Sequence, residues 1–349
     1  MKGAHRRALA LGLAAATLHA SSAGTPGMPA PLTPAENRRA PEQTFLTYPE
    51  WFLVFSPAEY AAFVRTAPPS EFPFFGHLRQ FWQAYAAVRR ASRPYPTNWG
   101  YHVMIVVIGV STTVEYGLRA AYETLVGRLT EIAAGGAVTQ EDAYAAQVAQ
   151  DYVDFIRVRP WYEFDFLRAL RGLWGETPLF GRHLLRKWER RYALTSEYLA
   201  KAFYGWLIGL ATRSAYAAES TVTAVVVDAL PQGIEHDLPE LRVIARPADG
   251  GALVHVPRYQ AFQDHALALA RGGARFREIA GNRGDILVSA LVPRGYRPAS
   301  GAASLLFAQP VLTQPDTERL VLTVPVPELH AVLPDLATPP RRLEHVYDY

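Results

Sequence analysis

The sequence predicts an α+β fold, in which an N-terminal multi-helix array precedes a smaller C-terminal α+β domain. Residues 43–218 are rich in aromatic side chains, and their apolar residues recur at helical spacing. Residues 219–349 are rich in valine, proline and glycine, and they contain short β-branched runs bounded by turn residues. A chain of 349 residues is long enough for two domains. We therefore expect a helical domain over 43–218 and an α+β domain over 219–349.

The first 23 residues have the order of a secretory signal peptide. Lys2, Arg6 and Arg7 precede an apolar run over residues 8–18, and small residues follow at 21–23. The run is about half of the ~20 residues that a transmembrane helix needs, so a cleaved signal is favoured over an uncleaved anchor. We therefore expect an exported protein, in the bacterial periplasm or associated with the inner membrane.

The segment that follows the signal, residues 24–42, is rich in proline, alanine and polar residues, and we expect it to form a disordered tether. Removal of the signal leaves 32 basic and 32 acidic residues, so the net charge of +3 belongs to the signal itself. We therefore expect no nucleic-acid partner. The chain has no cysteine, which excludes disulfides, thiolate metal sites and a cysteine nucleophile.

Cap signals and apolar periodicity define the expected helices. Thr47–Glu50 and Ser56–Glu59 both match S/T-x-x-E, in which a hydroxyl caps the first turn of a helix. Pro57 then fits the first helical position, where its missing N–H costs nothing. The pair Thr139 and Asp142 caps a further helix in the same way. Helices are expected over about residues 56–67, 75–90, 101–133, 139–155 and 182–216.

In the C-terminal domain, β-branched and alternating runs predict strands, and the sequence Ala-Asp-Gly-Gly at 248–251 predicts a hairpin turn. One amphipathic helix is expected over 259–271, and the pattern does not specify the order of the strands. The expected strands lie near residues 221–230, 241–247, 251–258, 276–280, 285–293, 302–312, 319–326 and 343–349.

Two apolar runs raise the question of membrane insertion. Residues 101–118 nearly reach the length that spans a bilayer, although His102 and Glu115 lie within them. Residues 202–211 form a second, shorter run. The two runs are either central helices of a soluble bundle, apolar because other helices surround them, or a helical hairpin in the membrane. The sequence leaves both interpretations open.

A basic cluster precedes the second apolar run and adjoins Trp188 and Tyr192. It fits contact with an anionic surface, and it equally fits a solvated helix face. Its members are Arg182, Arg186, Lys187, Arg190 and Arg191.

Recognisable catalytic motifs are absent: the chain has no Walker loop, no G-x-S-x-G elbow and no H-E-x-x-H sequence. We expect neither a cofactor nor a metal site. His77, His102 and Glu115 stand in apolar surroundings, where a titratable group can serve acid–base chemistry. Burial would raise the pKa of the Glu115 carboxyl unless a partner compensates. The alternatives are a structural His77 and a salt bridge between Glu115 and an arginine of a neighbouring helix.

Four carboxylates form a second set of candidates. Asp151 and Asp154 share a helical face with Arg157, and Glu163 and Asp165 lie in the aromatic stretch Trp-Tyr-Glu-Phe-Asp-Phe. Paired carboxylates can act as general acid and base, and acids among aromatic rings can hold sugars or cations. The alternative is that Asp154 and Asp165 form ordinary helix ion pairs with arginines.

Segments of the helical domain resemble a bacterial family of uncharacterised envelope proteins. The resemblance implies an export or anchor segment and one common architecture for both domains. Because that family has no assigned activity, the resemblance implies no catalytic residue. The similar segments are residues 44–64, 100–123, 145–166 and 184–209, and more faintly 257–282.

These observations predict an exported, non-catalytic envelope protein that binds an apolar ligand, a lipid or membrane surface, or a protein partner. One alternative is an integral membrane protein with a helical hairpin at 101–118 and 202–211. Another is an envelope enzyme of unrecognised type that uses buried carboxylates. Convergence of these carboxylates with His77 or His102 in one pocket would favour the enzyme.

Overall fold

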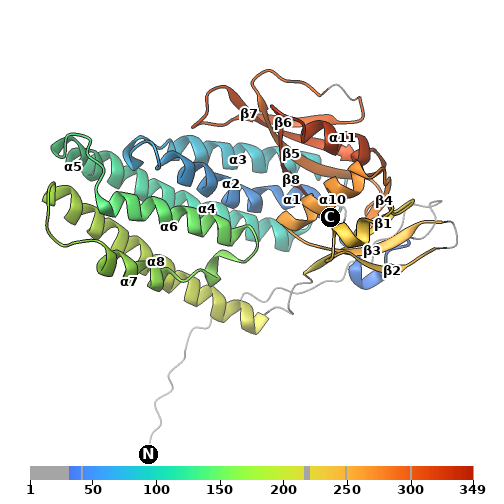
Figure 1. Cartoon of the computed structure of the whole chain (residues 1–349), viewed down its shortest axis with the longest axis horizontal. Coiled ribbons are helices and arrows are strands. Elements are labelled where there is room, and N and C mark those ends of the chain that lie inside the picture. The colour runs from blue at the N-terminus through green and yellow to red at the C-terminus, as the bar shows by residue number, and fades with distance from the viewer. Residues whose placement is uncertain (1–30, 41, 216–220, 248–249, 299–300, 349) are drawn as a thin grey trace, which may run out of the picture.

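The computed structural model describes residues 31–40, 42–215, 221–247, 250–298 and 301–348, with the side chains of 210–215 excepted. The expected signal peptide and most of the boundary near residue 218 lie outside the described residues. The fold is α+β, as predicted: helices form the N-terminal part, and two antiparallel four-stranded sheets with short helices form the C-terminal part (Figure 1).

Long helices run side by side through the N-terminal part of the chain (Figure 1). The expected helix over 101–133 is present as α4, a π-helical turn at Glu123–Gly127 and α5, which continue into one another. The helices are α1 (Gln43–Leu46), α2 (Tyr48–Phe63), α3 (Phe74–Ala91), α4 (Trp99–Tyr122), α5 (Arg128–Ala133), α6 (Gln140–Ile156), α7 (Phe166–Glu176) and α8 (Leu184–Ala215).

The cap predictions have mixed outcomes. Thr139 and Asp142 form the expected capping box at the start of α6. A helix start at Ser56 is wrong, because α2 continues through this position and contains Pro57, which removes one intrahelical hydrogen bond. The Ser56 hydroxyl is instead bonded to two side chains of α3 and α4, so tertiary contacts decide its role.

The C-terminal part contains sheet A, with strand order β2-β3-β1-β4, and sheet B, with strand order β6-β7-β5-β8. All expected strands are present, whereas two helices, α9 and α11, were not expected. In α11, Pro334 hides the helical pattern. The elements are β1 (Val222–Val227), α9 (Ile234–Asp237), β2 (Arg242–Ala245), β3 (Ala252–Pro257), α10 (Gln260–Arg271), β4 (Phe276–Ile279), β5 (Asp285–Pro293), β6 (Ser304–Pro310), β7 (Thr317–Pro325), α11 (Leu329–Leu336) and β8 (Arg342–Val346).

Sheet B is covered on both faces, which explains why β5 is apolar from Ile286 to Val292 except at the buried Ser289. Successive side chains of a strand point to opposite faces. Val288 and Leu322 belong to a core shared with α10 and α11. Leu287 and Val321 point the other way and pack with Tyr48 and other residues of α1, α2 and α3. The helical part and sheet B therefore share a hydrophobic core.

A buried ion pair crosses the same boundary. Arg319 of β7, only 1 % exposed, donates a hydrogen bond of 2.8 Å from Nη2 to Glu59 of α2. The same guanidinium also pairs with Glu344 of β8. A buried arginine needs such partners, because an unpaired charge in the interior is strongly unfavourable.

Residues 31–40 pack against sheet A, so the structure differs from the expected disordered tether over this part. Thr33 is fully buried and donates hydrogen bonds from its amide and its hydroxyl to Glu278 of β4, at 2.9 and 2.8 Å. The amide of Arg39 bonds the carbonyl of Ala280. Burial would raise the pKa of Glu278, but hydrogen bonds from the amides of Leu32 and Thr33 and from the side chains of Arg283 and Thr33 together outweigh burial and lower the pKa. In Figure 1 this blue segment lies beside the yellow strands.

Candidate functional site

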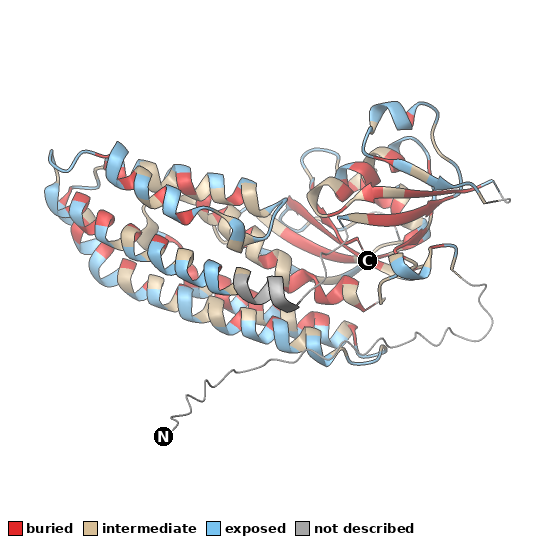
Figure 2. Ribbon diagram, turned by 90° about the horizontal axis from the view of Figure 1, so that it is seen from below, coloured by how far each residue is buried: buried red, intermediate tan, exposed pale blue. Residues whose placement is uncertain are grey.

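The most unusual feature of the molecule is the pair of helices α4 and α8, which lie antiparallel along one side of the helical part. With the π-helical turn and α5, the first helix spans Trp99–Ala133, or 35 residues. At 1.5 Å per residue this is about 50 Å. Figure 2 shows the two long helices side by side, α8 being the one with a grey end.

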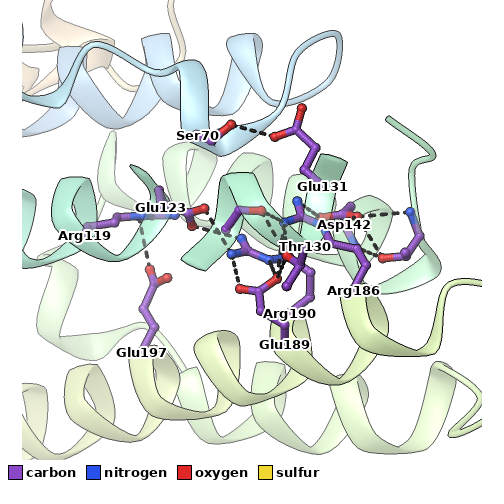
Figure 3. A network of polar contacts seen from close by, with 12 residues as sticks. Ser70, Arg119, Glu123, Thr130, Glu131, Asp142, Arg186, Glu189, Arg190 and Glu197 are labelled. Atoms are coloured by element: carbon purple, nitrogen blue, oxygen red, sulfur yellow. Dashed lines mark hydrogen bonds and ion pairs between the residues drawn. The ribbon is translucent and has the colours of Figure 1, made fainter. Parts of the chain in front are cut away.

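A ladder of ion pairs joins the two helices. Lys201 of α8 lies 3.2 Å from Glu115, and Arg119 lies 3.3 Å from Glu197. One helical turn or more further on, Arg190 forms a bidentate pair with Glu123. Figure 3 shows the middle and far part of this ladder, in which the side chains from the two helices point toward one another.

The four members of the basic cluster that lie on α8 are buried, so neither a solvated face nor direct contact with an anionic surface describes them. Lys187 and Arg191 pair with Glu141 of α6, at 3.0 and 2.7 Å, and Arg186 pairs with Asp142. The hydrogen bonds from Arg191 and Lys187 outweigh the effect of burial and lower the pKa of Glu141. Arg182 alone of the cluster is exposed.

The outward side of α8 is correspondingly apolar. No charged residue from 184 to 207 is classed as exposed, whereas Phe203 is 65 % and Trp206 62 % exposed. This is the reverse of a helix in water, whose apolar stripe faces the core. The exposed apolar residues of α8 include Leu184, Leu185, Trp188, Tyr192, Leu199, Phe203, Tyr204, Trp206 and Leu207.

The outward side of α4 and α5 is also rich in exposed apolar residues, although Glu115 and Arg128 are exposed there as well. The exposed apolar residues of α4 recur mostly at spacings of three or four and therefore share one face of the helix. The opposite side of the helix holds Ile105, Gly109 and Tyr116, which are buried. We call the exposed apolar residues of α4, α5 and α8 the apolar face. On α4 and α5 they include Val103, Val106, Val107, Val110, Val114, Leu118, Leu125, Leu129 and Ile132.

Two neighbouring helices do not continue the apolar face. Arg79 and Arg90 are exposed on α3, and Asp151 and Asp154 are exposed on α6. Among the described residues, Trp99–Ala133 is the one helix that is long and apolar enough to cross a membrane. Within residues 101–118 only Ile105, Gly109 and Tyr116 are buried, so a helix surrounded by other helices does not describe this run.

The structure places the three candidates from apolar surroundings on separate networks. Glu115 is 47 % exposed and pairs with Lys201, so the partner is a lysine rather than the expected arginine. Nδ1 of His102 lies 3.0 Å from the hydroxyl of Tyr85. His77 is fully buried, with Nδ1 2.9 Å from Ser56 and Nε2 3.6 Å from Glu59.

The second set of candidates lies at the surface. Asp154 pairs with Arg157 at 3.5 Å, and Asp165 caps α7 by accepting the amide of Arg168. Glu163 is exposed in the turn before α7, and Asp151 accepts a hydrogen bond from the side chain of Gln147. None of these carboxylates shares a network with His77 or His102 in the described part of the chain.

A buried polar cluster that sequence reasoning missed surrounds His77. The hydroxyl of Ser56 lies 2.7 Å from the hydroxyl of Tyr116 as well as next to His77. Glu59 links this chain to Arg319. Burial, and then the charge of Arg319, lower the pKa of His77 to about 3, so the imidazole is neutral. The serine and glutamate were visible in the sequence, but their pattern fitted a helix cap equally well.

No group of three or more metal-ligating side chains occurs among the described residues. The chain matches no known protein family, no curated protein and no solved structure. The resemblance to uncharacterised envelope proteins therefore stays a prediction.

Proposed function

We propose that this protein is an exported bacterial envelope protein that acts by binding, and that its apolar face contacts lipid hydrocarbon. The observation that carries this proposal is the orientation of α8, whose charges are turned inward while its aromatic and aliphatic side chains are exposed. In water, each Å² of exposed apolar surface costs about 25 cal/mol relative to burial. Large exposed apolar patches are typical of membrane or partner sites.

The helices beside the apolar face favour an in-plane position, in which α4 and α8 lie parallel to the membrane surface, over a hairpin that spans the membrane. The helix α3 packs along α4, and α6 packs against α8, and both expose charged side chains. If α4 and α8 crossed the bilayer, charges such as Arg79 and Asp151 would lie at membrane depth, at about 3 kcal/mol each near the centre. In the in-plane position these charges stay in water, and only one side of the molecule meets lipid.

The placement of the candidate carboxylates supports binding rather than catalysis. A pair of catalytic groups must lie within hydrogen-bonding reach of a common substrate. Glu115, Asp154 and Asp165 instead contact separate cations on separate helices. An envelope enzyme using these residues therefore has less support than a lipid-contacting protein.

Vesicle flotation tests the proposal, with the chain that begins at Gly24 as the parent. The variant Val110→Asp/Val114→Asp places two charges on the apolar face and should lose at least roughly tenfold in binding to phospholipid vesicles. The matched control is Ala143→Asp/Gln147→Asp, which has the same spacing on the polar side of α6 and should bind like the parent. Equal binding by both variants, or no binding by the parent, would contradict the proposal.

Chemical labelling separates the in-plane position from the spanning hairpin. The chain has no cysteine, so Pro94→Cys and Val138→Cys each introduce one reactive thiol, near opposite ends of α4 and α5. In vesicle-bound protein, an impermeant maleimide should label both sites from outside. Labelling of only one of them would support the spanning hairpin instead.

A further inference from the structure

A cavity of about 340 Å³ opens at the turn between α3 and α4, where the apolar face begins. Arg89 of α3 and Arg93 of the following turn contribute two guanidinium groups to its lining, and Glu42 contributes a carboxylate. Trp99, the first residue of α4, lines the cavity and is 74 % exposed. One turn further along the helix is Val103 of the apolar face.

The two arginines make the cavity a cation-rich site. In the described part of the chain, no carboxylate lies within ion-pair distance of either guanidinium group. Burial, and then the charge of Arg89, lower the pKa of His102, so the third basic side chain in the lining is neutral at pH 7. The formal charges of Arg89, Arg93 and Glu42 in the lining sum to one positive charge.

The start of α4 adds to the positive potential. The side chain of Asn98 caps the helix by accepting the amide of Tyr101. The amide end of a helix carries a partial positive charge, which favours an anion nearby. Arginine groups recognise phosphate oxygens by paired hydrogen bonds, and tryptophan is enriched at the level of lipid headgroups.

We propose that this cavity binds the phosphodiester of a phospholipid headgroup, with Arg89 and Arg93 as the groups that hold the phosphate. This inference rests on the proposed function, because the apolar face would place the acyl chains of the bound lipid in the adjoining bilayer. A phosphodiester carries one negative charge and matches the single net positive charge of the lining. A phosphomonoester carries a charge of about −1.5 to −2. Its additional negative charge would be repelled by the carboxylate of Glu42.

The test compares vesicles of phosphatidylglycerol with vesicles of digalactosyldiacylglycerol, a bilayer lipid without phosphate. The parent chain should bind both, and it should bind phosphatidylglycerol more tightly. Arg89→Gln/Arg93→Gln should reduce that preference roughly tenfold, because two charge-assisted contacts are lost. Arg79→Gln/Arg90→Gln removes the same charge from exposed positions of α3 outside the cavity, and it should keep most of the preference.

The outcomes separate this inference from the proposed function. If the parent binds both lipids equally, or if the two double variants lose the preference to the same extent, the headgroup site is wrong while membrane attachment stands. If the parent binds neither lipid, the proposed function fails. Calorimetry with soluble glycerophosphoglycerol tests whether the site binds a soluble phosphodiester rather than a membrane lipid. If this compound binds as tightly as the vesicles do, and if its binding depends on Arg89 and Arg93, the assignment to a lipid is wrong.

Discussion

The guanidinium of Arg190 donates two hydrogen bonds to the carboxylate of Glu123, 2.9 Å from Nη1 to Oε1 and 3.0 Å from Nη2 to Oε2. Both side chains are buried, and the carboxylate stands at the start of the π-helical turn that follows α4. Because α8 turns its charges inward, Arg190 and most of the others depend on an opposite charge from a neighbouring helix, whereas Glu189 pairs with Arg186 and Arg190 of α8 itself. The helix that exposes the apolar face therefore depends on buried ion pairs, and removal of one partner from such a pair strongly destabilises the protein.

The absence of a side chain at Gly127 leaves room for the ion pair between Arg190 and Glu123. A methyl group on Gly127 would lie 2.3 Å from Oε2 of Glu123 and 3.3 Å from Nη2 of Arg190. We expect Gly127→Ala to lower the free energy of unfolding by about 1–3 kcal/mol, because the bidentate pair must move. Urea unfolding followed by circular dichroism measures the change.

Gly117 on α4 is the matched control for that substitution. No atom lies within 4 Å of a methyl group added there. Alanine is the better helix former by up to about 1 kcal/mol, so Gly117→Ala should raise the free energy of unfolding. The two substitutions should therefore have opposite signs, and a stabilising Gly127→Ala would show that the pair has room to adjust.

The neutral imidazole of His77 predicts a dependence of stability on pH. Its pKa falls from 6.5 to about 3 in the folded protein, chiefly through burial. The unfolded chain therefore takes up this proton first as the pH falls, and stability from this group is lost between pH 6.5 and about 3. From about pH 7 to pH 5 the loss amounts to about 2 kcal/mol.

Urea unfolding at the two pH values isolates this contribution. The variant His77→Gln has no group that titrates here, so its free energy of unfolding should fall by about 2 kcal/mol less than that of the parent. His236→Gln, at an exposed position in α9, should leave the parental pH dependence unchanged. Identical pH dependence in the parent and His77→Gln would mean that His77 is protonated in the folded state.

The attachment of residues 31–40 to sheet A predicts an effect of Thr33→Val. The substitution removes the buried hydroxyl that donates to Glu278, and a hydrogen bond to a charged group contributes about 1.5–3 kcal/mol. We expect a loss of that size in the free energy of unfolding. Thr66→Val, at an exposed threonine, should change it by less than about 0.5 kcal/mol. Equal effects would indicate that this segment adds nothing to stability.

Much of the secondary structure followed from local patterns. The 101–133 helix, the Thr139 capping box and the strands of the C-terminal part required only apolar periodicity and cap residues. The pattern failed at Ser56, where a good cap sequence lies inside α2 because its hydroxyl bonds His77 and Tyr116. It also failed at 31–40, since a proline-rich composition does not reveal that Thr33 reaches a carboxylate 245 residues away.

The sequence by itself determined the α+β fold and the apolar character of residues 101–118, because both depend on the order of residues along one segment. It did not determine which side of each helix faces outward. Only the tertiary structure pairs Arg190 with Glu123 and Lys187 with Glu141, and so turns the charges of α8 inward. The reason is that these partners come from other helices, whereas the spacing within α8 predicts only its internal pairs, such as Lys201 with Glu197.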